Sequence, residues 1–145
     1  MKIGIVSDHR GYDLKKKIIS NIKNIEFVDL GTNSKESIDY PDYAFKLCNE
    51  LINKKIDLGI AICGSGIGMS IACNKVKGIR CARVTTIKDV KVTKQDNDAN
   101  VIAFSADINF NKVKRMIEEF INTPFSNEER HQKRINKIRE YELTL

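Results

Sequence analysis

The residues best suited to chemistry in this sequence are a cysteine and the glycine-rich segment after it. Cys63 precedes Gly64-Ser65-Gly66-Ile67-Gly68, where three glycines alternate just before a predicted helix. Such a backbone can turn its N–H groups into a concave nest, and the helix dipole adds positive potential there. The nest suits a phosphate or an enediolate oxygen, and the same potential favours the thiolate form of Cys63 as a base or nucleophile. A simple tight turn and a buried cysteine at a strand end are the alternatives.

The glycine-rich segment differs from the common nucleotide-binding motifs. It lacks the Gly-Lys-[Ser/Thr] ending of a Walker loop, and its third glycine comes too early for a dinucleotide-binding fingerprint. The other cysteines, at positions 48, 73 and 81, form no Cys-x-x-Cys pair, and the chain has only two histidines. We therefore expect no metal site, no cofactor and no disulfide framework, and we expect these three cysteines to act as small core residues.

Short apolar runs alternate with amphipathic stretches along the chain, and these elements must position the reactive residues. The patterns predict strands over Lys2–Ser7, Glu26–Leu30, Asp57–Cys63, Ile79–Val84 and Val101–Phe104. They predict helices over Tyr12–Lys23, Asp42–Asn53, Met69–Val76, Asp89–Gln95, Asn111–Ile121 and Asn127–Leu143. Continuous apolar strands joined by helices indicate a parallel sheet covered on both faces. We expect one three-layer α/β/α, Rossmann-like domain of about five strands over residues 1–145.

Polar segments adjoin the predicted strands, and open parallel sheets bind ligands at the carboxyl ends of their strands. The segments are Ser7–Gly11, Gly31-Thr32 with Asp39–Pro41, Cys63–Gly68, Thr85-Thr86, and Gln95–Asn100 before the last strand. We expect all of them to gather at one edge of the sheet.

Composition excludes several classes of protein. The chain has 145 residues and a net charge of +6, but its acidic residues are dispersed and it has no Trp. No basic run is interleaved with aromatic residues, so we expect a small anionic ligand and no nucleic acid. No apolar run approaches the length of a membrane span, and the first residues resemble a buried strand more than a signal peptide. We therefore expect a cytoplasmic protein without membrane contact.

Six separated segments together resemble the type B ribose-5-phosphate isomerase family, which also contains the galactose-6-phosphate isomerase subunits. They are Asp8-His9, Asp39-Tyr40-Pro41, Cys63–Gly68, Ala72–Lys75, Asn97–Asn100 and Arg130–Arg134. The resemblance covers essentially the whole chain. It implies a metal-free aldose–ketose isomerase of the pentose phosphate pathway. Such an enzyme interconverts D-ribose 5-phosphate and D-ribulose 5-phosphate through a cis-enediolate.

The resemblance also implies roles for individual residues. Cys63 would be the base that moves a proton between C1 and C2, Ser65 would hydrogen-bond the intermediate, and Asp96 would stand in the ring-opening position. The substrate-binding residues would be Asp8, His9, Tyr40, Gly64, Gly66, Ile67, Gly68, Asn97, Arg130 and Arg134. Arg130 and Arg134 are four residues apart and share a helical face, which suits a phosphate clamp, and a solvated face or an oligomer arm is the alternative. Family members share sites between subunits, so we expect a homodimer or homotetramer.

Two positions depart from the family pattern and keep other functions open. Asp96 stands where the family usually has histidine, and Asp107 stands where it commonly has a phosphate-binding arginine. Either Arg10 or Arg83 offsets the negative charge of Asp107, or the substrate differs from ribose 5-phosphate. The alternatives are an isomerase of galactose 6-phosphate or allose 6-phosphate, and a non-catalytic subunit that binds a sugar phosphate.

Overall fold

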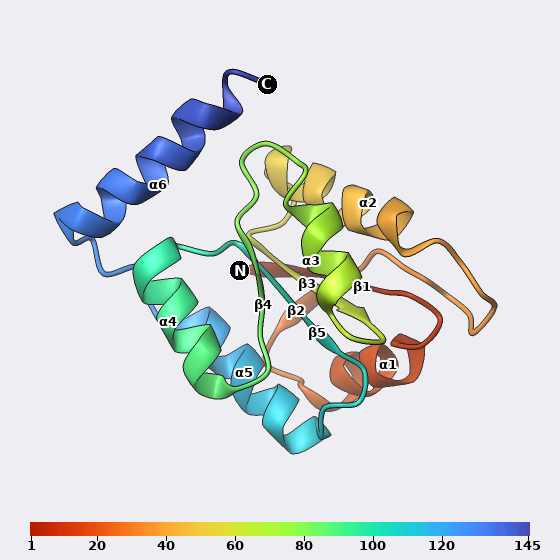
Figure 1. The fold of residues 1–145 in the computed structure, drawn as a ribbon. Helices are drawn as coiled ribbons and strands as arrows, with labels where there is room; N and C mark the ends of the chain where they lie inside the picture. The colour runs from red at the N-terminus through yellow and green to blue at the C-terminus, as the bar shows by residue number, and fades with distance from the viewer.

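A parallel sheet of five strands forms the centre of the molecule (Figure 1). The structure is a computed structural model and describes residues 1–145. Its strands are β1 (Lys2–Ser7), β2 (Glu26–Asp29), β3 (Leu58–Cys63), β4 (Cys81–Arg83) and β5 (Val101–Ser105). They lie in the order β2-β1-β3-β5-β4, and every neighbouring pair is parallel. The predicted three-layer α/β/α architecture is therefore confirmed.

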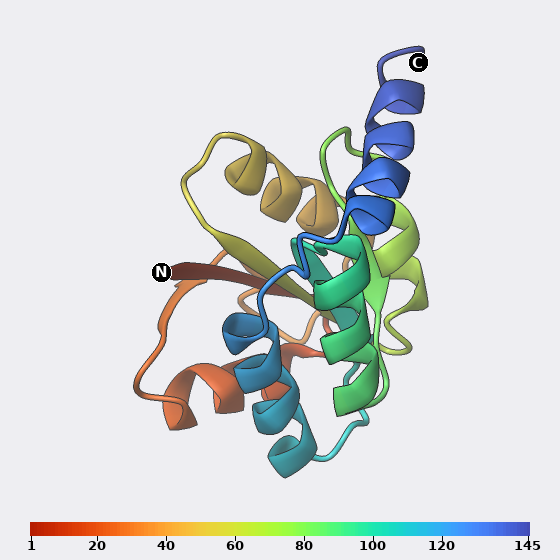
Figure 2. The same ribbon diagram turned by 90° about the vertical axis from the view of Figure 1, so that its left-hand side faces the viewer.

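Helices cover both faces of the sheet, as Figures 1 and 2 show. They are α1 (Tyr12–Asn21), α2 (Tyr40–Ile52), α3 (Ile67–Cys73), α4 (Ile87–Asn97), α5 (Phe110–Asn122) and α6 (Glu129–Glu142). α1, α4 and α5 pack on one face of the sheet, and α2 and α3 pack on the other. α6 extends away from the body and contacts mainly α4 (Figure 2). No helix has the length and apolar composition that a membrane crossing requires.

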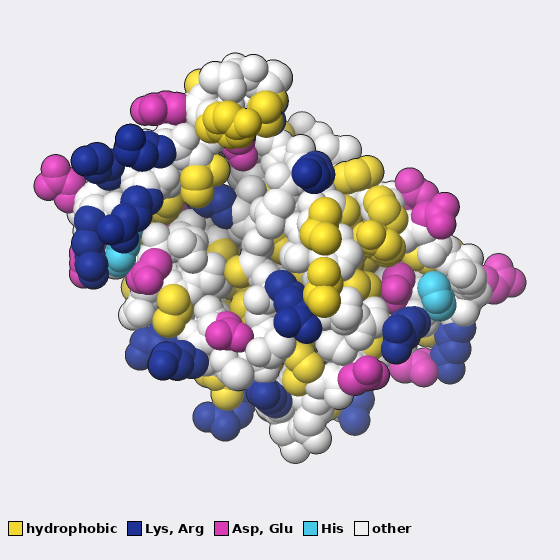
Figure 3. Space-filling model, in the orientation of Figure 1, with side chains coloured by type: hydrophobic (Ala, Val, Ile, Leu, Met, Phe, Trp, Pro, Cys, Tyr) yellow, Lys and Arg dark blue, Asp and Glu magenta, His cyan; other side chains and the backbone are white.

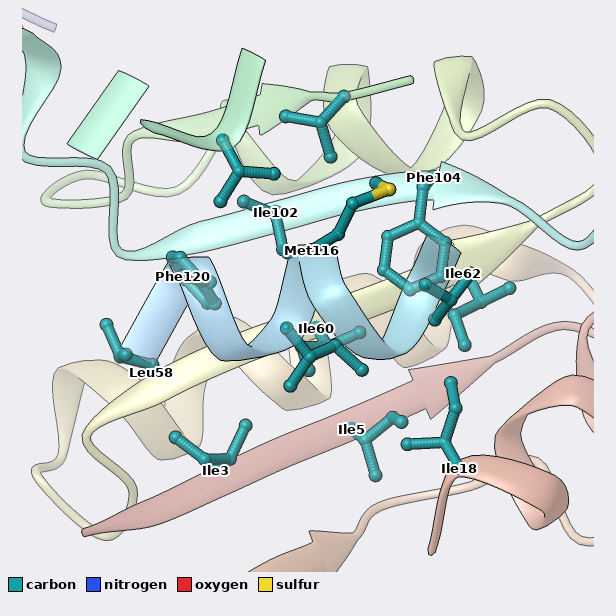
Figure 4. Packing of buried hydrophobic residues seen from close by; sticks show 14 of the residues in the cluster. Ile3, Ile5, Ile18, Leu58, Ile60, Ile62, Ile102, Phe104, Met116 and Phe120 are labelled. Atoms are coloured by element: carbon teal, nitrogen blue, oxygen red, sulfur yellow. The ribbon is translucent and has the colours of Figure 1, made fainter. Parts of the chain in front are cut away.

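The larger part of the core lies between β1, β3 and β5 and the helix α5 (Figure 4). Ile5, Ile60 and Ile102 extend from adjacent strands toward this layer and are fully buried. Met116 and Phe120 of α5 pack against them and are equally buried. Removing one such side chain from water stabilises the fold by about 1.5–3 kcal/mol. This packing fixes the central strands whose carboxyl ends carry the candidate site.

Local signals explain where the observed helices begin. α2 begins at Tyr40, two residues before the predicted start, because Pro41 suits the first turn and Asp39 adopts an extended N-cap conformation. α4 begins at Ile87 because Thr86 and Asp89 form a capping box, in which the Thr86 Oγ1 accepts the Asp89 N–H at 3.1 Å. β4 is shorter than predicted because it lies at the sheet edge and pairs only with β5.

Candidate active site

A cavity of about 250 Å³ lies at the carboxyl ends of β1 and β3. Its lining residues are Asp8, Arg10, Tyr40, Cys63, Gly64, Ser65 and Gly68. Six of these seven were predicted as site residues from the sequence. Arg10 was expected only as a possible counterion to Asp107. Cys63 and three residues of the glycine-rich loop thus border this hollow at the carboxyl edge of the sheet.

Cys63 is the last residue of β3, and its side chain is held against the start of α3. The residue is 5% exposed, and its Sγ accepts the Gly66 N–H at 3.1 Å. That N–H group and the adjacent helix start both stabilise negative charge on the sulfur. The thiol therefore lies at the cavity wall with a hydrogen-bond donor already directed at it.

The buried Cys48 differs from Cys63 in its surroundings. A hydrogen bond with Cys73 and burial in the α2–α3 core raise the pKa of the Cys48 thiol far above its usual range. Cys48 therefore remains protonated and cannot serve as a base. It behaves as the small core residue that its pattern predicted.

The loop after Cys63 contains backbone N–H groups without an acceptor, and three of the residues that carry them, Gly64, Ser65 and Gly68, line the cavity. The Ile67 N–H is bonded to the Ser65 Oγ at 3.1 Å, and the Gly66 N–H is bonded to the cysteine sulfur. The N–H groups of Gly64, Ser65, Gly68 and Met69 have no acceptor within the chain. Backbone donors of this kind stabilise an oxyanion that forms beside them.

Neighbouring elements determine the shape of this loop. Gly66 has φ 77°, a left-handed conformation that favours glycine, and a Cβ there would lie 2.7 Å from the Phe104 Cα. A Cβ on Gly68 would lie 2.6 Å from the Tyr40 ring, at Cζ. The Ser105 Oγ donates to the Gly64 carbonyl at 2.7 Å and anchors the loop to β5. Ser105 was not predicted, although its place at the end of the neighbouring strand is a usable signal.

The turn after β1 supplies the acidic wall of the cavity. Asp8 is 6% exposed, and its Oδ1 accepts the N–H groups of Arg10 and Gly11, each at 3.0 Å. His9 does not line the cavity. Its Nδ1 accepts the Ile38 N–H at 3.3 Å and tethers the segment that leads into Tyr40.

The remaining predicted residues lie elsewhere in the chain. α4 runs back from the carboxyl edge of the sheet, so Asp96 and Asn97 end up at the opposite edge, beside the start of β5. The expectation that Gln95–Asn100 joins the other polar segments is therefore wrong, because a residue just before a parallel strand lies at its amino end. Asn97 lines a different cavity, of about 360 Å³, between β4, α4 and α6.

Asp96 pairs with a residue of α6. Its Oδ1 lies 3.5 Å from the Nε2 of His131, which is buried and has its Nδ1 2.7 Å from the Ser126 Oγ. The sequence motif contained His131, but a role for it was not predicted.

The two arginines of the predicted clamp are exposed on α6. Arg130 donates from Nε to the Glu128 Oε2 at 2.8 Å, and this hydrogen bond lowers the pKa of the Glu128 carboxyl. Arg134 forms no ion pair within the chain. No residue of α6 lines the cavity beside Cys63.

Comparison with known proteins shows the family of this chain. Residues 3–138 match the model of a family described as Ribose/Galactose Isomerase. The chain belongs to this family. It is 41% identical over 146 residues to the putative sugar phosphate isomerase YwlF of Bacillus subtilis, covering 98% of this chain and 97% of that protein.

Solved structures of the family have the same fold. The ribose-5-phosphate isomerase B of Clostridium thermocellum superposes with a TM-score of 0.95 at 39% identity, covering 99% of each chain. The ribose-5-phosphate isomerase B of Mycoplasma genitalium, solved with bound ribulose-5-phosphate, gives a TM-score of 0.90 at 38% identity, covering 99% of this chain and 97% of that chain. Family membership and fold are thus established together.

Proposed function

We propose that this chain interconverts D-ribose 5-phosphate and D-ribulose 5-phosphate, with the Cys63 thiolate as the base. The observation that carries the proposal is the Cys63 Sγ at the wall of the cavity, beside backbone N–H groups that have no acceptor. The relative from Mycoplasma genitalium, which binds ribulose-5-phosphate, supports the choice of substrate.

The reaction follows from the arrangement of donors and base. The thiolate removes the proton from C2 of the open-chain aldose, a C1=C2 double bond forms, and negative charge develops on O1. The unpaired N–H groups of the loop stabilise that charge, and the Ser65 hydroxyl hydrogen can be donated to the same oxygens. The proton of O2 then passes to O1, and the thiol returns its proton to C1 as the C2 carbonyl forms.

We propose further that a second copy of the chain completes the site. Asp96, Asn97, Arg130 and Arg134 lie away from the cavity of their own chain, and Arg10 is the only Lys or Arg among its lining residues. A doubly charged phosphate needs more positive charge than this. Lys and Arg side chains gather on α6 (Figure 3), as a clamp reaching another copy would require.

Exposed apolar side chains support the same assembly. Ile67 and Ile71 of α3 are 48% and 57% exposed, and Phe45 of α2 lies on the same side of the sheet. Figure 3 shows hydrophobic side chains gathered over α2 and α3. Burying such residues against another subunit drives association. A homodimer is the smallest assembly that completes the site, and a homotetramer would contain the same pairs.

Within such an assembly, Asp96 is proposed to open the furanose ring. Its side chain is 46% exposed and retains a free carboxylate oxygen, while His131 lies 3.5 Å away. The carboxylate can take the proton from the O1 hydroxyl as the C1–O4 ring bond breaks, and it can return that proton to O4. The neighbouring His131 imidazole is also a proton-carrying group and can exchange a proton with the Asp96 carboxylate.

A six-carbon aldose phosphate is a second candidate substrate. The exposed Asp107 follows β5, and its N–H is bonded to the Ser105 Oγ, which itself contacts Gly64. An acid close to the loop disfavours a phosphate there, and the matching family model covers galactose as well as ribose isomerases. Comparing kcat/KM for ribose, allose and galactose phosphates distinguishes the candidates.

The deciding experiment measures isomerisation by the wild-type chain, by Cys63→Ala and by the control Cys81→Ala. Loss of a proton-transferring base lowers the rate by about 10²–10⁴-fold, so we expect such a fall for Cys63→Ala. Cys81 is half-buried on β4 and does not line the cavity, so its variant should retain activity. Equal rates for Cys63→Ala and wild type would remove the cysteine from the mechanism. Binding without turnover by the wild type would indicate a non-catalytic subunit.

A further inference from the structure

The turn between β1 and α1 places the guanidinium group of Arg10 at the cavity. Arg10 lines the same hollow as Cys63 and Ser65. Its backbone is held by the Asp8 carboxylate, which accepts the Arg10 N–H at 3.0 Å. The position of the residue is therefore determined by the turn, while its side chain extends over the glycine-rich loop.

The guanidinium lies directly over Gly64. A Cβ on Gly64 would lie 2.7 Å from the Arg10 Cζ and 3.0 Å from its Nε. The guanidinium thus occupies the space that a side chain at position 64 would need. Gly64 immediately follows Cys63, so the cation lies at the end of the cavity where the proposed base acts.

The positive charge of Arg10 has no partner within the chain. Its guanidinium takes part in no ion pair and no hydrogen bond, and its only polar contact is the backbone bond to Asp8. Arg83 differs, because its Nε donates to the Ser65 carbonyl at 3.1 Å. The planar guanidinium of Arg10 therefore retains all its N–H donors beside the unpaired N–H groups of the loop.

The charge balance of the cavity requires a cation at this end. Asp8 contributes a carboxylate, and the proposed reaction moves negative charge from sulfur to the O1 and O2 oxygens. Arg10 is the only permanently charged cation among the lining residues. The phosphate of the substrate lies at the opposite end of the sugar from C1 and C2, and Arg130 and Arg134 are the groups suited to it.

We propose that Arg10 is a further catalytic residue, whose guanidinium binds the enediolate oxygens as negative charge develops on them. This inference rests on the proposed isomerase function. Because the contact strengthens as charge develops, it lowers the energy of the transition state more than that of bound substrate. Removing one donor aimed at a developing oxyanion costs about 10²–10³ in kcat.

The test compares Arg10→Gln, Arg10→Lys and the control Arg115→Gln, which removes an exposed arginine of α5 on the other face of the sheet. We expect Arg10→Gln to lower kcat by about 10²-fold with little change in KM. Arg10→Lys should recover part of this loss, and Arg115→Gln should match the wild type. Thermal denaturation checks that each variant folds.

Two ligands separate stabilisation of the enediolate from binding of the phosphate. A phosphorylated four-carbon hydroxamate imitates the planar, anionic enediolate, whereas ribitol 5-phosphate carries the phosphate without a carbonyl. For Arg10→Gln, calorimetry should show hydroxamate affinity falling by about the same factor as kcat/KM, with ribitol 5-phosphate affinity unchanged. A matching fall for ribitol 5-phosphate would make Arg10 a phosphate ligand and overturn the inference.

Other outcomes also distinguish the two proposals. If Arg10→Gln kept the kinetics and the hydroxamate affinity of the wild type, the proposed role of Arg10 would be overturned, while the proposed isomerase function would stand. Absence of turnover by the wild-type chain would overturn the proposed function and this inference with it.

Discussion

Two inactive variants of this chain are expected to restore activity when they assemble together. Cys63→Ala removes the proposed base, and Arg134→Ala removes an exposed cation of α6. The two residues do not line a common cavity in one chain. If a second copy completes each site, the base and the arginine of one working site come from different subunits.

The size of the effect follows from symmetry. A homodimer has two equivalent sites, each with Cys63 from one subunit and Arg134 from the other. In a dimer of the two variants, one site lacks both residues and the other has both. The mixed dimer should therefore show about half of the wild-type activity per dimer, whereas each parent variant should be nearly inactive.

The assay uses co-expression of the two variants with different affinity tags, followed by purification on both tags. Turnover of ribose 5-phosphate is then measured for the mixed dimer and for both parents. The matched control pairs Cys63→Ala with Asp8→Ala, two substitutions in the same cavity. Neither site of that mixed dimer is intact, so it should remain inactive. If the Cys63→Ala and Arg134→Ala pair stays as inactive as its parents, the shared-site proposal is refuted.

The remaining predictions concern the supports of the site. Gly66→Ala should lower the free energy of unfolding in urea by about 2–4 kcal/mol, because φ 77° is strained for alanine and its Cβ meets the Phe104 backbone. Gly78→Ala should lower the free energy of unfolding by less, since the added Cβ meets only a flexible side chain. An equal decrease for the two variants would contradict this explanation. Lys15→Met should lower the free energy of unfolding by about 3 kcal/mol in the same titration. The reason is that the fully buried Lys15 ammonium contacts Asp29 Oδ1 and the Thr32 carbonyl, each at 2.6 Å. An unchanged urea midpoint would argue against a stabilising role for the Lys15–Asp29 pair. Iodoacetamide near neutral pH should modify Cys63 while Cys48 stays unmodified, because the raised pKa of Cys48 keeps it a thiol as the pH rises through the range where ordinary cysteines ionise. Peptide mapping that finds Cys48 modified first would contradict this.

The sheet was predictable because its central strands are buried on both faces. Every residue of β3 is buried, so this strand appears in the sequence as a continuous apolar run. The loop after Cys63 was predictable for a related reason, since glycines between a strand and a helix are typical of a ligand-binding turn. Errors at element ends came from local caps such as Thr86, which extend a helix beyond its apolar pattern.

The second half of the candidate site could not be located from sequence order alone. Asp96 directly precedes the motif Asn97–Asn100, but α4 carries it to the far edge of the sheet, where it contacts His131. The direction of the Arg10 side chain could not be predicted from the sequence either. It depends on space over Gly64 that only the folded turn creates.

The two halves of the proposed site differ in how the fold holds them. The cavity beside Cys63 is constrained on three sides, because the loop packs against Arg10, Tyr40 and the backbone of β5 at Phe104. α6 is attached by fewer buried residues, His131 and Ile135. The base and the backbone donors are thus held by a rigid sheet edge, as proton abstraction from carbon requires. The cations proposed to bind the phosphate lie instead on α6, a helix with few buried residues. In such an arrangement, one chain alone could retain the geometry for proton transfer and still bind its substrate weakly.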